Sequence, residues 1–231
     1  MNPFKTLSRP LLTLLFCVLS GLAFSGLLAP AAASSVTVSP TTLQLRPGER
    51  AAQLTLINTG NQEVTFDLNL FSWAQNEGED LLTSTQAVVV APNFVTLKPG
   101  QSQTVRLVRL GNPPLNEAAY RLLATERAAP GIGGVSTRLQ LSVPLFDGPK
   151  TTTPTGTALQ VSLTADGTLS LQNVSSEHLR LSSLELRVND AWTAAPIIYL
   201  LAGQRRILDV TNVQELRFSS NGGTAESVRV R

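Results

Sequence analysis

Short segments of alternating apolar and polar residues follow one another along most of the chain, and this pattern constrains the fold more than any other feature. The clearest example is "RLQLSVPLF", residues 138–146, in which every second residue is apolar. Successive side chains of a β-strand point to opposite faces, so such a segment indicates a strand with one buried face. No window shows a helical period of useful length. The sequence therefore predicts an all-β fold.

Turn signals separate these segments. "RPGE" at residues 46–49 and "KPGQ" at residues 98–101 each place proline and then glycine at the centre of a tight turn. Proline presets the first central dihedral angle, and glycine accepts the positive φ of a type II turn. Asp166 and Gly167 give a strong signal for a two-residue hairpin turn. Short strands with such turns between them favour a β-sandwich.

The segment "DGPKTTTPTG" interrupts this pattern with threonine, proline and glycine, which is typical of a linker. We therefore predict two sandwich domains at residues 34–146 and 157–231, joined by a linker at residues 147–156. The second domain is shorter than the ~100 residues of an immunoglobulin-type sandwich.

Residues 1–33 have the features of a secretory signal peptide. Lys5 and Arg9 give a positive start, Leu11–Phe24 is apolar, and small residues in an A-x-A pattern end at Ala33. The segment could instead stay as a membrane anchor, although its apolar core is shorter than a spanning helix needs. Lipidation at Cys17 is a weaker alternative, because a bulky phenylalanine precedes it.

Composition argues against several classes of function. The only cysteine lies in the predicted leader, and His178 is the only histidine, so no thiolate site and no histidine pair for zinc is expected. Loss of Lys5 and Arg9 leaves equal numbers of basic and acidic side chains, which gives no basic field for nucleic acid. There is no G-x-S-x-G elbow or P-loop. We expect no catalytic residues, no cofactor, no metal and no small-molecule substrate, and we expect His178 to be solvated at a loop edge.

The apolar face of the segment at 138–146 must be buried against something. Leu139, Leu141, Val143 and Leu145 share one face, while Pro144 cannot donate to a sheet ladder and favours a sheet edge. An apolar edge strand pairs readily with other chains, so proteins usually avoid exposing one. The row of side chains either forms one wall of its own domain or is presented to a partner.

Several motifs together resemble the periplasmic chaperones of the chaperone–usher pathway, in a divergent branch of that family. They are "TLKPGQSQTVRL" (96–107), "YRLLATE" (120–126), "RLQLSVPLF" (138–146) and "SPTTLQLRPGERAAQLTLINTG" (39–60). The resemblance covers most of the first predicted domain and is weak to absent in the second. It implies two immunoglobulin-like β-sandwich domains and a location in the periplasm.

The resemblance also implies a mechanism. Members of this family lend their G strand to a pilus or fibre subunit that lacks its own last strand, which is a form of β-augmentation. The lent side chains would be Leu139, Leu141, Val143 and Leu145. We expect those near the linker to pack in the core of their own domain and the others to point outward. The expected partners are fibre subunits and an outer-membrane usher. The alternative is a secreted immunoglobulin-like adhesion or carbohydrate-binding module without chaperone activity.

The sequence departs from the better-known family members at the site that holds the subunit's terminal carboxylate. The matching positions fall near Thr42 and at Pro144, and neither residue is basic. Arg106, Arg109 and Arg121 are the candidates for a replacement, since arginine suits bidentate capture of a carboxylate. Each could instead form a surface ion pair or lie along the sheet with its head in water. Arg106 and Arg109 are three residues apart on one expected strand, so they should point to opposite faces.

Overall fold

A computed structural model describes residues 35–76, 78–127, 138–148 and 158–230. The predicted leader at 1–33 and most of the predicted linker lie outside these residues. The described residues belong to one compact unit. Within the described ranges, no helix is long and apolar enough to cross a membrane.

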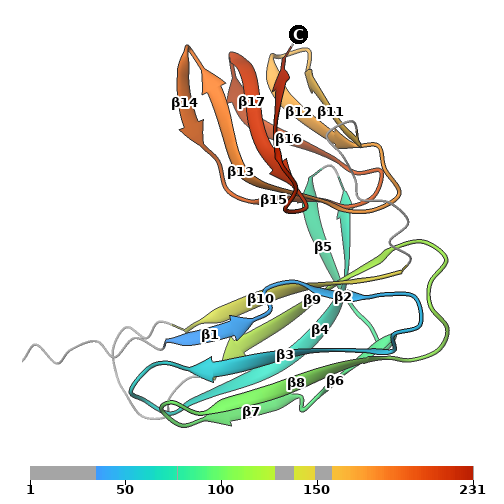
Figure 1. Cartoon of the computed structure of the whole chain (residues 1–231), viewed down its shortest axis with the longest axis vertical. Helices are drawn as coiled ribbons and strands as arrows, with labels where there is room; N and C mark the ends of the chain where they lie inside the picture. The colour runs from blue at the N-terminus through green and yellow to red at the C-terminus, as the bar shows by residue number, and fades with distance from the viewer. Residues whose placement is uncertain (1–34, 77, 128–137, 149–157, 231) are drawn as a thin grey trace, which may run out of the picture. The chain divides into compact units, whose positions relative to one another are not determined.

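The described residues form eighteen β-strands (Figure 1). The strands are β1 (Val36–Ser39), β2 (Leu43–Leu45), β3 (Ala51–Asn58), β4 (Val64–Asn76), β5 (Glu79–Ser84), β6 (Val88–Ala91), β7 (Phe94–Leu97), β8 (Ser102–Arg109), β9 (Ala118–Glu126), β10 (Gln140–Asp147), β11 (Leu159–Leu163), β12 (Thr168–Asn173), β13 (Leu179–Val188), β14 (Ala191–Ala194), β15 (Ile198–Leu200), β16 (Arg205–Thr211), β17 (Val213–Ser220) and β18 (Ala225–Arg229).

The first ten strands make two facing sheets. One sheet has the order β1-β3-β8-β6, and the other has the order β2-β10-β9-β4-β5, with β7 also paired to β4. The strands β1 and β2 are consecutive in the chain but belong to different sheets. Strand β2 runs parallel to β10, whereas the other strand pairs are antiparallel.

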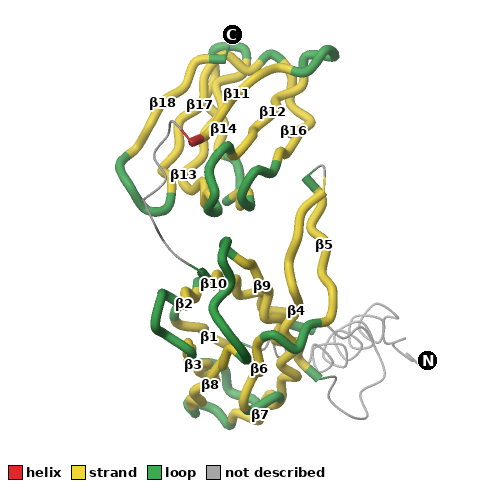
Figure 2. Tube along the Cα trace, turned by 90° about the vertical axis from the view of Figure 1, so that its right-hand side faces the viewer, coloured by secondary structure: helices red, strands yellow, loops and turns green. Residues whose placement is uncertain are grey.

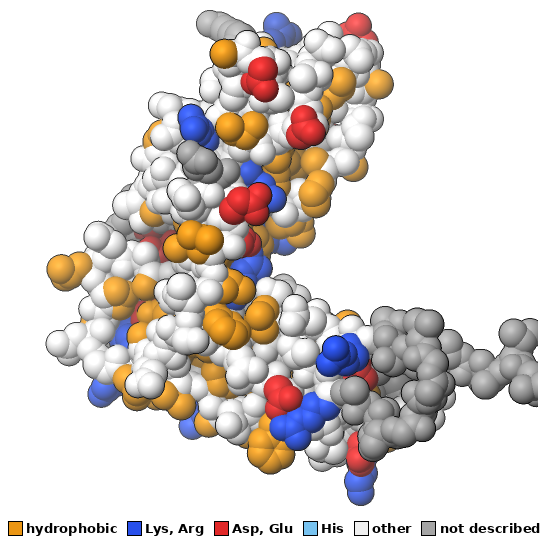
Figure 3. Space-filling model, turned by 180° about the vertical axis from the view of Figure 1, so that it is seen from behind, with side chains coloured by type: hydrophobic (Ala, Val, Ile, Leu, Met, Phe, Trp, Pro, Cys, Tyr) orange, Lys and Arg blue, Asp and Glu red, His pale blue; other side chains and the backbone are white. Residues whose placement is uncertain are grey.

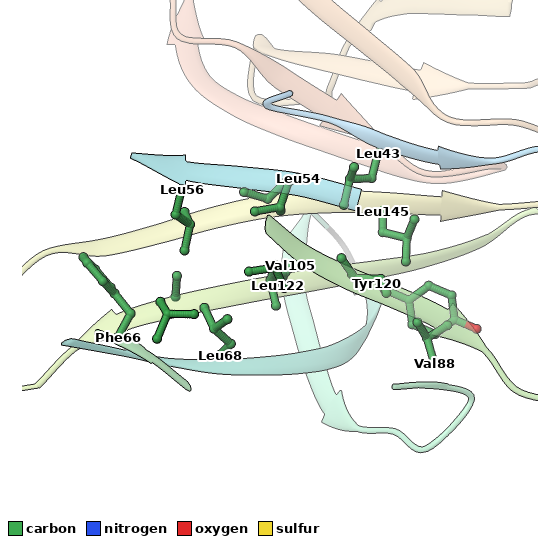
Figure 4. Close-up of a cluster of buried hydrophobic side chains, with 14 of the residues drawn as sticks. Leu43, Leu54, Leu56, Phe66, Leu68, Val88, Val105, Tyr120, Leu122 and Leu145 are labelled. Carbon is green, nitrogen blue, oxygen red and sulfur yellow. The ribbon is translucent and has the colours of Figure 1, made fainter. Parts of the chain in front are cut away.

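The core of this sandwich follows from the alternation in the sequence. Leu54 and Leu56 of β3 point inward from one sheet, and Phe66 of β4 and Leu122 of β9 point inward from the other (Figure 4). Leu145 of β10 joins the same cluster and is fully buried. Burying such a side chain contributes about 1.5–3 kcal/mol before entropy costs.

The last eight strands make two further sheets, with the orders β11-β12-β16 and β14-β13-β17-β18, and β15 also pairs with β13. Their core is a second, separate cluster that includes Leu171, Leu184 and Phe218. Strands and connecting loops make up nearly all of the described chain (Figure 2). The predicted fold class, all-β with two sandwiches, is confirmed.

The turns show why these strands end where they do. Gly48 and Gly100 have φ values of 87° and 75°, and the turns close through hydrogen bonds from Glu49 N to Arg46 O and from Gln101 N to Lys98 O. These are the tight turns that the sequence predicts. The β11–β12 hairpin is also present, but Thr164 and Thr168 close it around three residues rather than the expected two.

Candidate functional site

The strand β10 has neighbours on both sides over only part of its length. It pairs with β9 from Gln140 to Asp147, but β2 covers its other side only from Leu145 onward. Among the described residues, no strand pairs with the other side of residues 140–143, and we call this stretch the open edge. The sequence predicted an edge for the whole strand, and this holds only for the first part, because the short β2 crosses over from the other sheet to cover the rest.

The position of Pro144 fits this arrangement. Glu126 N donates to Leu139 O at 2.9 Å, which fixes the phase of the ladder between β10 and β9. In an antiparallel pair, alternate residues bond to the partner strand, so the main-chain groups of Gln140, Ser142 and Pro144 point away from β9. The missing N–H of Pro144 therefore removes no bond to β9. Proline is tolerated within this strand because that position faces away from β9, at the point where the open edge ends and the pairing with β2 begins.

The four apolar side chains of β10 divide into two pairs. Val143 and Leu145 are 3% and 0% exposed and belong to the core of the first sandwich. Leu139 and Leu141 are only partly buried, and they pack against the rim of that core. The two residues nearest the predicted linker thus pack fully within their own domain, while the other two retain accessible surface beside the open edge.

A second free edge lies on the same side of the sandwich. Among the described strands, β1 is the last strand of the other sheet and pairs only with β3. Its Val36 and Val38 are also partly buried against the same core. Figure 1 shows β1 and β10 in the two facing sheets at this side. We call Val36, Val38, Leu139 and Leu141 the apolar row. A row of half-covered aliphatic side chains thus borders two unpaired strand edges.

The end of β10 is held by aromatic side chains on the opposite face of its sheet. Phe146 stacks on His178, with ring centroids 3.4 Å apart, and contacts Trp73 and Tyr199. His178 is not solvated as the sequence suggested. Its Nδ1 lies 2.9 Å from Glu117 Oε2 and its ring is covered by Phe146. Glu117 and Phe146 are distant in sequence, so local polarity alone gave the wrong environment.

Arg109 is buried and already has an internal partner. Its Nη1 lies 2.5 Å from Asp147 Oδ1, and its Nη2 donates to Glu49 O at 2.7 Å. Burial raises the pKa of the Asp147 carboxyl group, and the neighbouring Arg109 guanidinium opposes that shift. Arg109 therefore fixes the end of β10 to its own domain, and it could bind another carboxylate only by giving up Asp147.

Arg106 is exposed on β8, in the sheet that does not contain β10, and its strand neighbours are Gln53 and Ala91. Arg106 and Arg109 do point to opposite faces of their strand, as the three-residue spacing predicts. The position of Arg106 brings it to neither the open edge nor the aromatic cluster.

Arg121 lies next to the open edge. It is the cross-strand neighbour of Pro144 in the register between β9 and β10. Its guanidinium carbon lies 3.7 Å from the ring centroid of Trp73, and its nitrogens lie 3.3 Å from Ser142 Oγ and 3.4 Å from Asp80 Oδ2. Burial lowers the pKa of Arg121, and Asp80 acts in the opposite direction. The guanidinium is thus partly desolvated and has only long contacts to oxygen.

The two positions where the resemblance led us to look for basic residues are neighbours in space. The parallel register of β2 and β10 places Thr42 beside Pro144, and Thr42 Oγ1 lies 3.3 Å from Tyr199 Oη. Arg121 reaches the same place from the adjoining strand. Nearby, Trp73 Nε1 is buried and has no hydrogen-bond partner in the described structure. The Arg121 guanidinium and the unpaired Trp73 N–H therefore lie close to the uncharged residues Thr42 and Pro144.

No local sequence pattern predicts the aromatic cluster, because its members come from four separate strands or loops: Trp73, Phe146, His178 and Tyr199. The Arg109–Asp147 pair was partly signalled. Arg109 shares a face with Val105 and Leu107, and a guanidinium on an apolar face needs a buried partner. What the sequence could not supply was the distance to Asp147, which was assigned to the linker but ends β10.

A β-sandwich with an incompletely paired strand, followed by a second sandwich, is the architecture that the family resemblance implies. The chain belongs to the family of pili and flagellar-assembly chaperones, because the model of its PapD N-terminal domain matches residues 35–152, just over half of the chain. The resemblance drawn from the motifs is thus confirmed, and the protein is a pilus assembly chaperone by family. No curated protein matches the chain.

Solved structures share its fold at low identity. A chain of the CsuC–CsuE chaperone–tip adhesion subunit complex, from archaic Csu pili of Acinetobacter baumannii, is 21% identical with a TM-score of 0.65 and covers 85% of this chain and 98% of that one. A chain of the Salmonella enterica SafA pilin–SafB chaperone complex is 16% identical with a TM-score of 0.64, covering 84% and 96%. The Pseudomonas aeruginosa CupB2 chaperone is 17% identical with a TM-score of 0.59, covering 83% and 98%.

Proposed function

We propose that this protein is a periplasmic chaperone that binds pilus or fibre subunits by lending them the open edge of β10, and that it delivers them to an outer-membrane usher. The observation that carries the proposal is the apolar row beside two free strand edges. Family membership and the complexes formed by two of its structural neighbours, one with a tip adhesion subunit and one with a pilin, support the choice of partner.

The open edge offers both parts of a β-augmentation site. Gln140 and Ser142 present outward N–H and C=O groups, so a strand can be added beside residues 140–143. Leu139 and Leu141 then insert into the unfinished core of the subunit. Because both are already partly buried, the gain from covering each is smaller than the ~1.5–3 kcal/mol of full burial.

The fixed half of β10 makes this loan possible. Val143, Leu145 and the Arg109–Asp147 pair keep the strand in place when no subunit is bound. A preformed strand loses little conformational freedom on binding, which favours association. In this proposal the donor residues are Leu139 and Leu141, while Val143 and Leu145 act from within the chaperone.

Arg121 is the residue that we propose for binding the subunit's terminal carboxylate. It is adjacent to Pro144, it is partly desolvated, and its contacts to Asp80 and Ser142 are long. Trp73 Nε1 could supply a further donor. Arg109 is committed to Asp147, and Arg106 belongs to the other sheet. Charge-assisted hydrogen bonds of this kind are worth roughly 1.5–3 kcal/mol.

Co-expression with a tagged immunoglobulin-like subunit from the same gene cluster tests the donor strand. Leu141→Glu places a charge in the apolar row and should abolish co-purification, while the chaperone stays folded. Gln140→Glu adds the same charge to the same strand on the opposite face, and it should leave capture intact. Equal capture by both variants would refute the donor role of Leu141. Recovery of the wild-type protein from the periplasmic fraction, with the leader removed, tests the location.

Arg121→Met tests the carboxylate site in the same assay, with Arg106→Met as its matched control. We expect Arg121→Met to weaken capture about 10- to 100-fold, since it removes charge-assisted hydrogen bonds. Arg106→Met should have no effect. Loss of capture through Arg106 and not Arg121 would overturn this assignment without touching the role of β10. Usher delivery is tested separately, by asking whether the purified complex binds the usher while the free chaperone does not.

A further inference from the structure

An acidic side chain lies on the core face of β9, at the last residue of the strand. Leu122 and Ala124 are buried, so the alternation places Glu126, two residues further on, on the same face. Its cross-strand neighbour on β4 is Phe66, which is fully buried. On the surface seen in Figure 3, acidic side chains lie scattered among polar and apolar ones, where water solvates them. A half-buried carboxylate on an apolar face instead needs a hydrogen-bond donor.

A donor to this carboxylate is the main chain of Leu139, the first of the two proposed donor residues. Leu139 N donates to Glu126 Oε2 at 2.9 Å, and Glu126 N donates to Leu139 O at 2.9 Å. Both main-chain groups of Leu139 therefore bond to the same residue of the neighbouring strand. We call these two hydrogen bonds the Glu126 clamp.

The Glu126 clamp replaces one bond of a regular ladder. In a regular antiparallel pair, Leu139 N would donate to the main-chain oxygen of Glu126. Here the side-chain carboxylate accepts this hydrogen bond, and the regular pairing of the two strands starts one residue later, at Gln140 opposite Thr125. Leu139 thus lies just before the regular strand, and the side chain of Glu126 extends the ordered edge to include it.

Packing holds Leu139 less firmly than it holds the other end of β10. The side chain of Leu139 is only partly buried at the rim of the core, whereas Val143 and Leu145 are buried. Strand β2 pairs with β10 only from Leu145 onward, far from this end. Fixing the backbone of a residue in one conformation has an entropic cost. A hydrogen bond that already fixes Leu139 in the free protein lowers the part of this cost that falls on binding.

We propose that Glu126 is a positioning residue for strand donation. Its carboxylate holds Leu139 extended and in line with Leu141, so that both side chains are ready to enter the unfinished core of a subunit. Glu126 acts through Leu139 and does not itself bind the subunit. The inference rests on the proposed function, because positioning Leu139 matters for capture only if this part of β10 is lent to a subunit.

A positioning role and a purely structural role have different consequences. If the clamp mainly stabilised the sandwich, its loss would lower the stability of the whole protein. The clamp lies at the end of the ladder, however, and Val143 and Leu145 hold the rest of β10 in the core. Its loss should therefore free only the residues at this end of the strand, where local opening is separate from global unfolding.

Amide hydrogen exchange of the purified protein, followed by NMR, tests the clamp without any subunit. Glu126→Ala should speed exchange at the Leu139 amide by about 5- to 30-fold, the factor that corresponds to freeing the backbone of one residue. Exchange at Val143 and the urea unfolding curve should not change. Glu126→Gln keeps an oxygen that can accept from Leu139 N and should retain most of the protection. Glu63→Ala, at an exposed glutamate, is the matched control and should change nothing.

Competition for a limiting amount of subunit, between each variant and a differently tagged wild-type chaperone, measures the effect on capture. Glu126→Ala should be about 5- to 30-fold weaker than the wild type, and Glu126→Gln should be close to it. The inference is overturned if Glu126→Ala does not speed exchange at Leu139, if Glu126→Gln behaves like Glu126→Ala, or if Glu126→Ala competes as well as the wild type while Leu141→Glu fails. Capture that survives Leu141→Glu would refute the donor role itself, and the positioning role with it, whatever the exchange rates.

Discussion

The two halves of β10 carry the same alternating sequence but have different surroundings. From Val143 to Asp147 the strand is buried, lies next to β2 and ends in an internal ion pair. From Leu139 to Ser142 it is paired on one side only, and its leucines are partly covered. The difference shows that one strand can be anchored in its own core and still offer an unpaired edge, provided that its neighbour is short.

The short neighbour is what creates the difference. Strand β2 has only three residues, and its partners on β10 are residues 145–147. Pro144 stands at the point where this pairing stops, and no N–H is available there to extend it. The division of β10 is thus built into both strands. Substitutions in the buried half should affect the stability of the protein, and substitutions in the open half should affect binding.

The largest effect should come from the ion pair that ends the buried half. Asp147→Ala leaves the buried Arg109 guanidinium without its partner, which costs about 3–5 kcal/mol of unfolding free energy. Burial raises the pKa of Asp147 in spite of Arg109, so desolvation outweighs the attraction between them. The double variant Arg109→Met/Asp147→Leu should therefore be close to the wild type in stability. Urea unfolding measures both, and equal losses in the two variants would contradict this account.

The leucines of the two halves give the next largest contrast. Leu145→Ala removes a fully buried side chain and should destabilise the protein by about 2–5 kcal/mol, because a cavity remains. Leu141→Ala removes a partly buried one and should cost about 1 kcal/mol. Thermal or urea unfolding of the two variants measures the difference. If they lose the same stability, the open half is as much a part of the core as the buried half.

Much of the fold could be predicted from alternation and turn residues. Both were local signals: "RPGE" and "KPGQ" form the expected turns, and the face shared by Leu139, Leu141, Val143 and Leu145 points to the core side. What local patterns could not supply was how far that face is covered. This depends on β2, a strand of three residues from another part of the chain.

The candidate arginines illustrate the same limit. The three-residue spacing correctly predicts that Arg106 and Arg109 point to opposite faces of their strand. It does not identify Asp147 as the partner of Arg109, because the sequence pattern assigns Asp147 to the linker. Arg121 becomes the preferred candidate only once the strand register places it beside Pro144 and its guanidinium is seen to lie over Trp73. Register and long-range packing are properties of the folded chain, so sequence alone could not rank these three residues.

Proline scanning offers a sharper test of where the open edge begins. Val143 N bonds to β9, so Val143→Pro removes a buried ladder bond and should cost about 1–3 kcal/mol in addition to any loss of packing. Ser142 N points to the open edge, and Ser142→Pro should change the stability by less than 1 kcal/mol. It should nevertheless weaken subunit capture, because it removes a donor that an added strand would use. Similar unfolding curves for the two variants would contradict the derived phase.

The smallest effect is expected for Gln140, which lies in the open half but faces away from the apolar row. Its Nε2 donates to Thr125 Oγ1 at 2.9 Å on the exposed face of the sheet. Gln140→Ala breaks this surface bond and should change the unfolding free energy by no more than about 0.5 kcal/mol. Capture should also be unchanged, because the main chain of residue 140 and the leucines beside it stay in place. A marked loss of capture would mean that partners bind the outer face of β10, and the two halves would then differ in stability alone.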